Sequence, residues 1–204
     1  MIRRRGALFV VSAPSGAGKT TLCREVRRLL PDLAYSISVT TRAPRPGEVT
    51  GVDFDFVNDD EFGALLEQGA FAEWATVHGH LYGTRAGTLE ATLAAGVDVL
   101  LDIDTQGAAQ LRARYPEAVL VFIVAPSMGE LEQRLRERRS DAAADIARRL
   151  RRAREEIGLW RRYDYLIVNR DLKEAIDHLT AIIQAERCRT VRLGLRFPDL
   201  EVKD

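Results

Sequence analysis

The feature that most constrains the fold is an eight-residue loop near the N-terminus, which runs Ala13-Pro14-Ser15-Gly16-Ala17-Gly18-Lys19-Thr20. It follows an apolar run and precedes a segment of helical character. It matches the G-x-x-x-x-G-K-[ST] pattern, except that Ala13 takes the first glycine position. Glycines let backbone N–H groups surround phosphate oxygens, and a helix N-terminus adds partial positive charge. The loop therefore predicts a nucleoside triphosphate site, in which Lys19 reaches the β- and γ-phosphates and Thr20 binds Mg²⁺.

Four short runs of β-branched and aliphatic residues predict strands. Each run is nearly continuous rather than alternating, which is typical of parallel strands covered on both faces. Segments of helical character separate or follow them, and this repetition favours a parallel sheet between two helical layers. The predicted strands span residues 7–11, 97–103, 118–124 and 165–168, and the predicted helices span 19–30, 106–114, 127–139, 144–160 and 172–189.

Two stretches interrupt this repetition. Residues 38–90 hold Pro44, Pro46 and seven of the fifteen glycines, and they predict a small mixed or antiparallel insertion. Residues 136–145 are rich in charge and lie between two predicted helices. We expect a single domain over residues 1–204 with a three-layer α/β/α core (1–37, 91–133 and 150–204), the insertion at 38–90 and a lid at about 134–149.

Composition narrows the class of protein. The chain has 30 basic and 30 acidic residues, so its overall charge does not point to nucleic acid or to a membrane surface. Its longest apolar run, residues 118–125, is far shorter than the roughly 20 residues that span a bilayer. The two cysteines, Cys23 and Cys188, are too few for a disulfide scaffold and suggest a reducing compartment. We expect a cytoplasmic protein with small-molecule partners, either a monomer or a homo-oligomer.

An acidic pair ends the second predicted strand. The run from Val99 to Asp104 is Val-Leu-Leu-Asp-Ile-Asp, which is typical of a Walker B segment. Because parallel strands open at one edge of the sheet, Asp102 and Asp104 should face the same crevice as the phosphate loop. Asp102 would then help Thr20 to hold the metal, directly or through water. A polar strand-to-helix junction with a helix-capping role is the alternative for this pair.

The insertion carries two arginines three residues apart, Arg42 and Arg45, on either side of Pro44. Such a pair can hold a phosphate dianion bidentately. At this point the sequence resembles the guanylate kinase family, in its bacterial form, over nearly the whole chain. The resemblance is carried in family order by Val11 to Lys19, Thr40-Thr41-Arg42, Pro44-Arg45, Gly47-Glu48, Phe71-Ala72-Glu73-Trp74, Tyr82-Gly83-Thr84, Leu101 to Asp104, Gln106-Gly107 and Asp164 to Asn169.

The resemblance implies a reversible, Mg²⁺-dependent transfer from ATP to GMP, giving ADP and GDP. We expect dGMP to be a second acceptor, giving dGDP. It implies that ATP is bound by Ala13, Pro14, Ser15, Gly16, Ala17, Gly18, Lys19, Thr20, Thr21 and Asn169. It implies that GMP is bound by Ser38, Arg42, Arg45, Glu73, Tyr82, Thr84 and Asp104. The implied catalytic set is Lys19, Arg42, Arg134, Arg138 and Arg149, the last three being lid residues.

The chemistry of guanine agrees with the implied acceptor residues. Guanine presents N1–H and an N2 amino group side by side, so the Glu73 carboxylate can accept from both. Its O6 and N7 atoms need donors, which Ser38 and Thr84 can supply. Adenine instead turns a lone pair towards the carboxylate, and such a site rejects the wrong base by about 10⁴–10⁵-fold.

The sequence departs from the family at Phe54, where a tyrosine usually contacts the GMP phosphate. Losing a hydrogen bond to a charged group costs about 1.5–3 kcal/mol, so we expect weaker GMP binding but not lost activity. The lid assignment also has an alternative: Arg148, Arg151 and Arg152 crowd the same region, and a solvated arginine-rich helix face would give a similar pattern.

Two further functions stay open at this point. A kinase for a phosphorylated sugar such as a ribose bisphosphate could share this scaffold, but it would not need the predicted base-binding residues. A non-catalytic protein-binding module could also resemble the family, but such modules characteristically lose the phosphate loop. This chain keeps Lys19 and Thr20.

Overall fold

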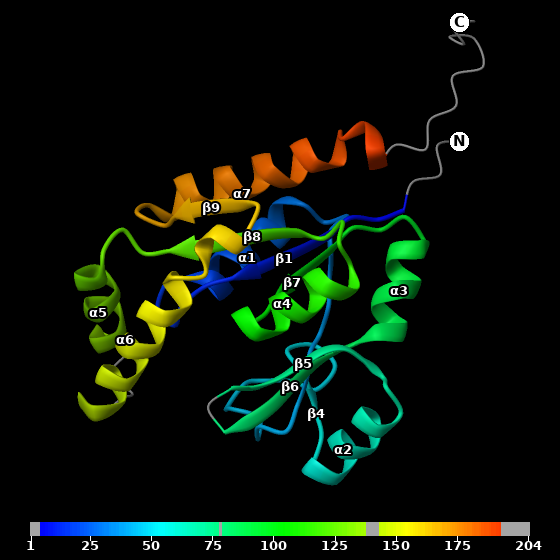
Figure 1. Cartoon of the computed structure of the whole chain (residues 1–204), viewed down its shortest axis with the longest axis horizontal. Helices are drawn as coiled ribbons and strands as arrows, with labels where there is room; N and C mark the ends of the chain where they lie inside the picture. Colours follow the sequence, from blue (N-terminus) through cyan, green and yellow to red (C-terminus); the bar gives the residue numbers. More distant parts are fainter. Residues whose placement is uncertain (1–4, 78, 138–142, 193–204) are drawn as a thin grey trace, which may run out of the picture.

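The computed structural model describes residues 5–77, 79–137 and 143–192, and within these ranges nine strands form two sheets (Figure 1). The larger sheet has the order β2-β7-β1-β8-β9, and all of its neighbouring strands pair in parallel. Its strands are β1 (Leu8–Ser12), β2 (Ala34–Tyr35), β7 (Val99–Asp102), β8 (Val119–Val124) and β9 (Tyr165–Val168). The four strands expected from the sequence are confirmed, while the two-residue edge strand β2 was not predicted.

Helices cover both faces of this sheet, as the continuous apolar runs predicted. One layer contains α1 (Lys19–Leu29) and α7 (Leu172–Arg187), and the other contains α3 (Ala86–Ala94) and α4 (Thr105–Arg114). Successive side chains of β1 enter different clusters: Phe9 packs with the α1 and α7 layer, whereas Leu8 and Val10 pack with the α3 and α4 layer. A strand buried on both faces has no polar face, which explains why its sequence does not alternate.

The smaller sheet has the order β4-β3-β6-β5 and lies beneath the core in Figure 1. Its strands are β3 (Val39–Thr40), β4 (Asp55–Phe56), β5 (Phe71–Val77) and β6 (His80–Arg85), and α2 (Asp59–Glu67) packs against them. β3 pairs in parallel with β4, and β6 pairs antiparallel with β3 and β5, so the sheet is mixed as predicted. Phe62 and Phe71 stack with their rings 4.5 Å apart in a separate small core.

The boundaries of the predicted insertion stay a prediction. Helix α3 begins inside the range 38–90, yet Leu89 and Leu93 belong to the hydrophobic cluster of the main sheet. The start of helix α2 is determined by its local sequence, because Asn58 and Glu61 form a reciprocal capping box there.

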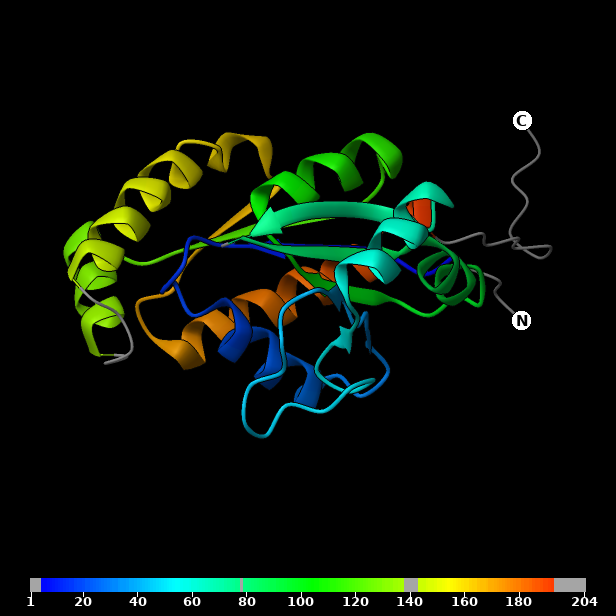
Figure 2. The ribbon, with the colours of Figure 1, turned by 90° about the horizontal axis from the view of Figure 1, so that it is seen from below.

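At one end of the molecule lie α5 (Met128–Glu137) and α6 (Ala143–Ile157), which contact one another (Figures 1 and 2). They overlap the predicted lid. Two short 3₁₀ helices, η1 (Trp160–Arg162) and η2 (Thr190–Arg192), complete the elements of the described residues. None of the helices in these residues is long and apolar enough to span a membrane.

Candidate functional site

The phosphate loop joins the end of β1 to the start of α1, in the context that the sequence predicted. Gly16 and Gly18 have φ values of 92° and 93°, a left-handed conformation that other residues rarely adopt. At Gly18 space is also a constraint, since an added Cβ would collide with the Asn169 carboxamide. The loop conformation therefore depends on both glycines.

Lys19 lies where the two central strands open. Its Nζ donates to the carbonyl oxygen of Ile103 at 2.8 Å and lies 3.2 Å from Asp102 Oδ1. β1 and β7 are paired neighbours, with Val11 opposite Asp102, so the phosphate loop and the acidic segment share one edge of the sheet. The predicted common crevice is present.

Asp104 does not continue the strand as a second acidic residue on its face. β7 ends at Asp102, and Asp104 is the N-cap of α4, with its Oδ1 accepting from the Gly107 N–H at 2.9 Å. The capping alternative is therefore realised at Asp104. Its Oδ2 lies 3.5 Å from Arg152 Nη2, and the residue borders two adjoining pockets.

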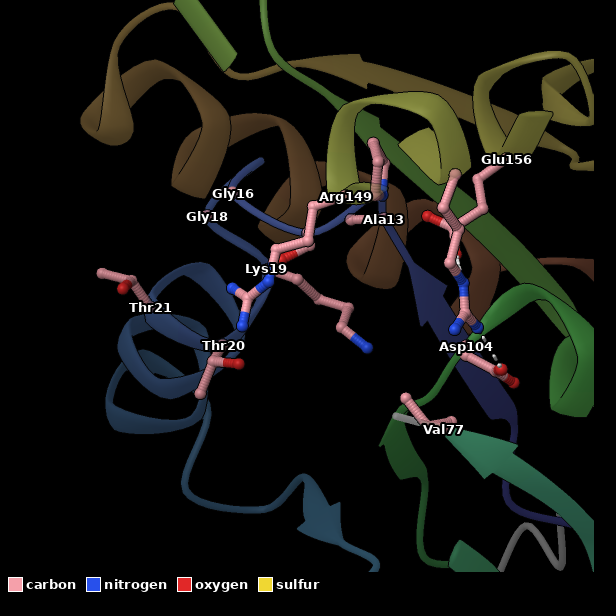
Figure 3. Close-up of a pocket in the computed structure, with 13 residues that line it drawn as sticks. Ala13, Gly16, Gly18, Lys19, Thr20, Thr21, Val77, Asp104, Arg149 and Glu156 are labelled. Atoms are coloured by element: carbon pink, nitrogen blue, oxygen red, sulfur yellow. Dashed lines mark hydrogen bonds and ion pairs between the residues drawn. The ribbon is translucent and has the colours of Figure 1, made fainter. Parts of the chain in front are cut away.

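The first pocket, of about 220 Å³, is here called the phosphate-loop pocket (Figure 3). Figure 3 shows Lys19 extending into it, between Thr20 and Asp104. Its wall is formed by Ala13, Pro14, Ser15, Gly16, Gly18, Lys19, Thr20, Thr21, Val77, Asp104, Arg149, Arg152 and Glu156. Two of the predicted ATP residues are not in this wall: Ala17, a fully buried residue of the loop, and Asn169.

Helix α6 supplies three of these wall residues, Arg149, Arg152 and Glu156. Their spacing of three and four residues places them on one helix face, so they are a local signal that could have been recognised. Arg149 was predicted, but Arg152 and Glu156 were not. Arg152 Nε donates to Glu156 Oε1 at 2.9 Å, and burial raises the pKa of Glu156.

The second pocket, of about 160 Å³, is here called the acceptor pocket, and it lies between the two sheets. It is lined by Lys19, Ser38, Phe54, Glu73, Ala75, Val77, Tyr82, Asp102, Ile103 and Asp104. Lys19, Val77 and Asp104 border both pockets. A group bound in one pocket is therefore adjacent to a group bound in the other.

Glu73 is the buried carboxylate of the acceptor pocket, with 4% of its surface exposed. Burial raises its pKa from the usual 4.5 to about 7, against the opposing effect of a hydrogen bond from Thr84. That bond runs from Thr84 Oγ1 to Glu73 Oε1 at 2.5 Å. The structure thus brings Glu73 and Thr84 together. The Thr84 hydroxyl donates its hydrogen bond to Glu73, so it does not offer a donor to the pocket.

Gly107 contributes to this site in a way that the sequence analysis missed. A Cβ at this position would collide with Glu73 Oε2. Because Gly107 also donates its N–H to Asp104, one residue contacts two of the three carboxylates that line the pocket, Glu73 and Asp104. The Gln-Gly pair was noted only as part of the family resemblance.

Arg42 is held in place by three acceptors. Its guanidinium donates to Glu48 Oε1 at 2.9 Å, to the Ala43 carbonyl oxygen at 2.8 Å and to Tyr82 Oη at 3.2 Å. The hydrogen bond with Glu48 raises the pKa of Arg42 and lowers that of Glu48. The guanidinium also lies 5.3 Å from the centre of the Phe54 ring. Arg42 and Tyr82 are therefore together, as predicted.

Arg45 is not part of this arrangement. Its side chain is exposed and does not line the acceptor pocket, although its backbone N–H donates to Glu48 Oε2 at 2.7 Å. The spacing of the two arginines suggested a shared phosphate grip. In this structure Arg42 bonds Tyr82, and the shared grip of the two arginines on a phosphate stays a prediction.

Asn169 and Arg134 support the phosphate loop from behind. Asn169, 6% exposed, donates its Nδ2–H to the Ala17 carbonyl oxygen at 2.8 Å. Arg134 Nη2 donates to the Asn169 carbonyl oxygen at 3.0 Å. The third predicted lid arginine, Arg138, lies outside the described residues.

The predicted metal residues supply two oxygen donors. Thr20 is exposed at the start of α1 in the phosphate-loop pocket, and Asp102 lies beside Lys19 in the acceptor pocket. The described residues contain no group of three or more His, Cys, Asp or Glu side chains that could hold a metal. Hydroxyl and carboxylate oxygens nevertheless fit Mg²⁺, which is commonly held by one or two protein oxygens together with substrate phosphates.

Comparisons with known proteins agree with this geometry. The family model described as guanylate kinase matches residues 5–186. A guanylate kinase from Syntrophotalea carbinolica is 52% identical over 206 residues, covering 100% of this chain and 98% of the relative. One from Geobacter sulfurreducens is 52% identical over 192 residues, covering 94% and 95%.

Solved structures give the same result. A crystal structure of guanylate kinase from Anaplasma phagocytophilum matches with a TM-score of 0.80 and 36% identity, covering 95% of this chain and 93% of that one. Sequence and fold therefore agree over almost the whole chain. This chain belongs to the guanylate kinase family.

Proposed function

We propose that the phosphate-loop pocket binds ATP, that the acceptor pocket binds GMP, and that the γ-phosphoryl group passes between them. Family membership makes the chain an enzyme that converts GMP to GDP with ATP. The observation that carries the assignment is the shared wall of the two pockets, which includes Lys19 and Asp104. Adjoining pockets bring donor and acceptor phosphates together, and alignment is the main requirement of phosphoryl transfer.

On the donor side, backbone N–H groups of residues 13–21, except Pro14, would bind the ATP phosphates. Lys19 would exchange its bond to the Ile103 carbonyl oxygen for the β- and γ-phosphate oxygens. Thr20 and Asp102 would hold the Mg²⁺ that accompanies ATP and helps to neutralise phosphate charge. Asn169 would act through the Ala17 carbonyl oxygen, by fixing the loop beneath the nucleotide.

On the acceptor side, ionised Glu73 would accept from N1–H and the N2 amino group of guanine. Asp104 borders the same pocket and would accept from the base, while Ser38 would donate to it. Arg42 and Tyr82, already hydrogen-bonded to each other, would bind the phosphate of GMP. Arg45 and Thr84 need a change of partner or conformation before they could contact GMP.

Helices α5 and α6 would complete the site. Arg149 borders the phosphate-loop pocket and would stabilise charge on the transferred group, with Arg134 and Arg138 as the other proposed lid arginines. Closure of this region would exclude water, which otherwise competes with GMP as the acceptor. A general base is not required, because the attacking phosphate oxygen is already anionic.

The test is to follow ADP production from ATP and Mg²⁺ with GMP, dGMP, AMP, CMP, UMP and ribose 1,5-bisphosphate as acceptors. We expect turnover with GMP and dGMP only. Turnover confined to ribose 1,5-bisphosphate would overturn the assignment in favour of a sugar-phosphate kinase. No turnover with any acceptor would favour a binding module, and Lys19→Ala is the control for contaminating kinases.

A further inference from the structure

Helix α4 presents three residues to the edge of the smaller sheet. Gly107, Gln110 and Arg114 are spaced by three and four residues, so they lie on one helix face. All three meet β5, which is the edge strand of that sheet: Gly107 lies against Glu73, Gln110 bonds Trp74, and Arg114 Nη1 donates to the Phe71 carbonyl oxygen at 3.1 Å. The contacts of this face of α4 therefore extend along β5 to both sides of Glu73.

Gln110 makes an unusual contact in this row. Its Nε2 donates to the Trp74 carbonyl oxygen at 2.7 Å, and its Oε1 accepts from the Trp74 N–H at 3.1 Å. A single side-chain amide thus binds both backbone groups of one residue, as the next strand of a sheet would. These groups belong to the residue that follows Glu73, on the side where β5 pairs with no other strand of the described residues.

The pairing of β5 is irregular next to the residue that Gln110 binds. The pairing of β5 with β6 shifts register between Phe71 and Glu73, which indicates a bulge. A bulge interrupts the regular ladder, bends the strand and re-aims the side chains beside it. The contacts of α4 hold the backbone on either side of the shift.

We propose that Gln110 and Gly107 are positioning residues that set the Glu73 carboxylate for guanine recognition. The inference rests on the proposed binding of GMP in the acceptor pocket. Gly107 leaves the space that Glu73 Oε2 occupies, and Gln110 fixes the backbone one residue further on. Since the N-cap of α4 is Asp104, one helix sets two carboxylates of the same pocket.

The variant Gln110→Ala tests the proposal through steady-state kinetics. We expect the KM for GMP to rise about tenfold, a loss comparable to one or two net hydrogen bonds. The kcat and the KM for ATP should stay within about twofold, because the phosphate-loop pocket does not contact Gln110. The preference for GMP over IMP, which lacks the N2 amino group, should fall as Glu73 loses its fixed position.

Two further variants sharpen the test. Gln110→Glu keeps the length of the side chain and can accept from the Trp74 N–H, but its ionised form cannot donate to the carbonyl oxygen. We expect its KM for GMP to lie between those of the wild type and Gln110→Ala, and it carries the test if Gln110→Ala does not fold. Gln184→Ala, at an exposed position of α7, is the matched control and should behave as the wild type.

The outcomes separate this inference from the function on which it rests. If the wild-type enzyme does not turn over GMP, the proposed function fails. If the wild type is active and Gln110→Ala keeps its KM for GMP and its GMP/IMP preference, the positioning role is wrong. A parallel rise in both KM values with a lowered Tm would show general destabilisation, and this too would overturn it.

Discussion

The two pockets are built in opposite ways. The phosphate-loop pocket takes most of its wall from the contiguous residues 13–21, fixed by the central strand and two positive-φ glycines. The acceptor pocket is assembled from Ser38, Glu73, Tyr82 and Asp104, which come from separate elements of both sheets. Backbone geometry from one segment suits a ligand group that every nucleotide shares, whereas separate side chains can distinguish one base from another.

Replacing Lys19 should have the largest effect, because this residue belongs to the phosphate loop and its side chain also lines both pockets. We expect Lys19→Met to lower kcat by about 10³-fold, since stabilisation of the charge that develops in the transition state is lost. Stopped-time ADP assays at saturating ATP and GMP would measure the loss. GMP affinity by calorimetry should change only a few-fold, and a kcat within tenfold of wild type would contradict the role.

Changing Glu73 should affect the acceptor pocket alone. We expect Glu73→Gln to lower kcat/KM for GMP by about 10²-fold, because a charge-assisted pair of hydrogen bonds is lost. The KM for ATP should hardly change. Glu67→Gln, at an exposed position of α2, is the matched control. An equal rise in the KM for GMP and in the KM for ATP would show that binding in one pocket depends on the other.

The KM for GMP should also depend on pH through Glu73, with a smaller effect than the substitution itself. Burial raises the pKa of Glu73 to about 7, and the proposed pairing with guanine needs the ionised form. The KM for GMP should therefore fall about tenfold between pH 6 and 8, as one titrating group requires. The phosphate of GMP also titrates near pH 6, so the comparison is with Glu73→Gln, which should lose this part of the profile. A profile that is unchanged in Glu73→Gln would contradict the assignment.

The same pKa shift predicts the opposite effect on the stability of the empty enzyme. The folded pKa lies above the usual value of 4.5, so the folded state binds more protons than the unfolded state between pH 4.5 and 7. The contribution of Glu73 to stability is present below this window and is lost as the pH rises through about 7. Thermal unfolding of the wild type relative to Glu73→Gln would measure it.

The smallest expected effect concerns Phe54, which lines the acceptor pocket beside Arg42 and lies edge-on to Tyr82. Phe54→Tyr should lower the KM for GMP about threefold. A hydrogen bond to a charged phosphate usually contributes more, but Arg42 beside this ring is expected to compensate for the missing hydroxyl already. Phe56→Tyr is the control, because Phe56 also lies near Arg42 but does not line the pocket. Equal effects of the two substitutions would show that the ring position does not matter.

The sequence predicted what depends on local pattern. The four long core strands and the phosphate loop followed from continuous apolar runs and from one motif, and the structure confirms both. The partners of Arg42 and the exposure of Arg45 did not follow, because the path of the turn around Pro44 decides which arginine meets Tyr82. The family resemblance assigned the same GMP-binding role to Arg42 and Arg45.

Contacts between distant segments were the least predictable part of the site. Gln110 and Gly107 reveal their roles only when α4 lies against the edge of β5. Arg152 and Glu156 did show helical spacing, but an arginine-rich solvated face has the same pattern. The division of the chain into core, insertion and lid stays a prediction, and the packing of α3 shows that these parts share residues near position 90.

The hydrogen bond from Asn169 to Ala17 has a consequence for biosynthesis. Its two partners are 152 positions apart, and β9, which leads to Asn169, is an edge strand added late in translation. A nascent chain therefore carries the complete phosphate-binding motif long before the residue that supports it has been made. Until β9 has been added, the Ala17 carbonyl oxygen lacks this donor, so the supported form of the loop requires nearly the whole domain to have been synthesised.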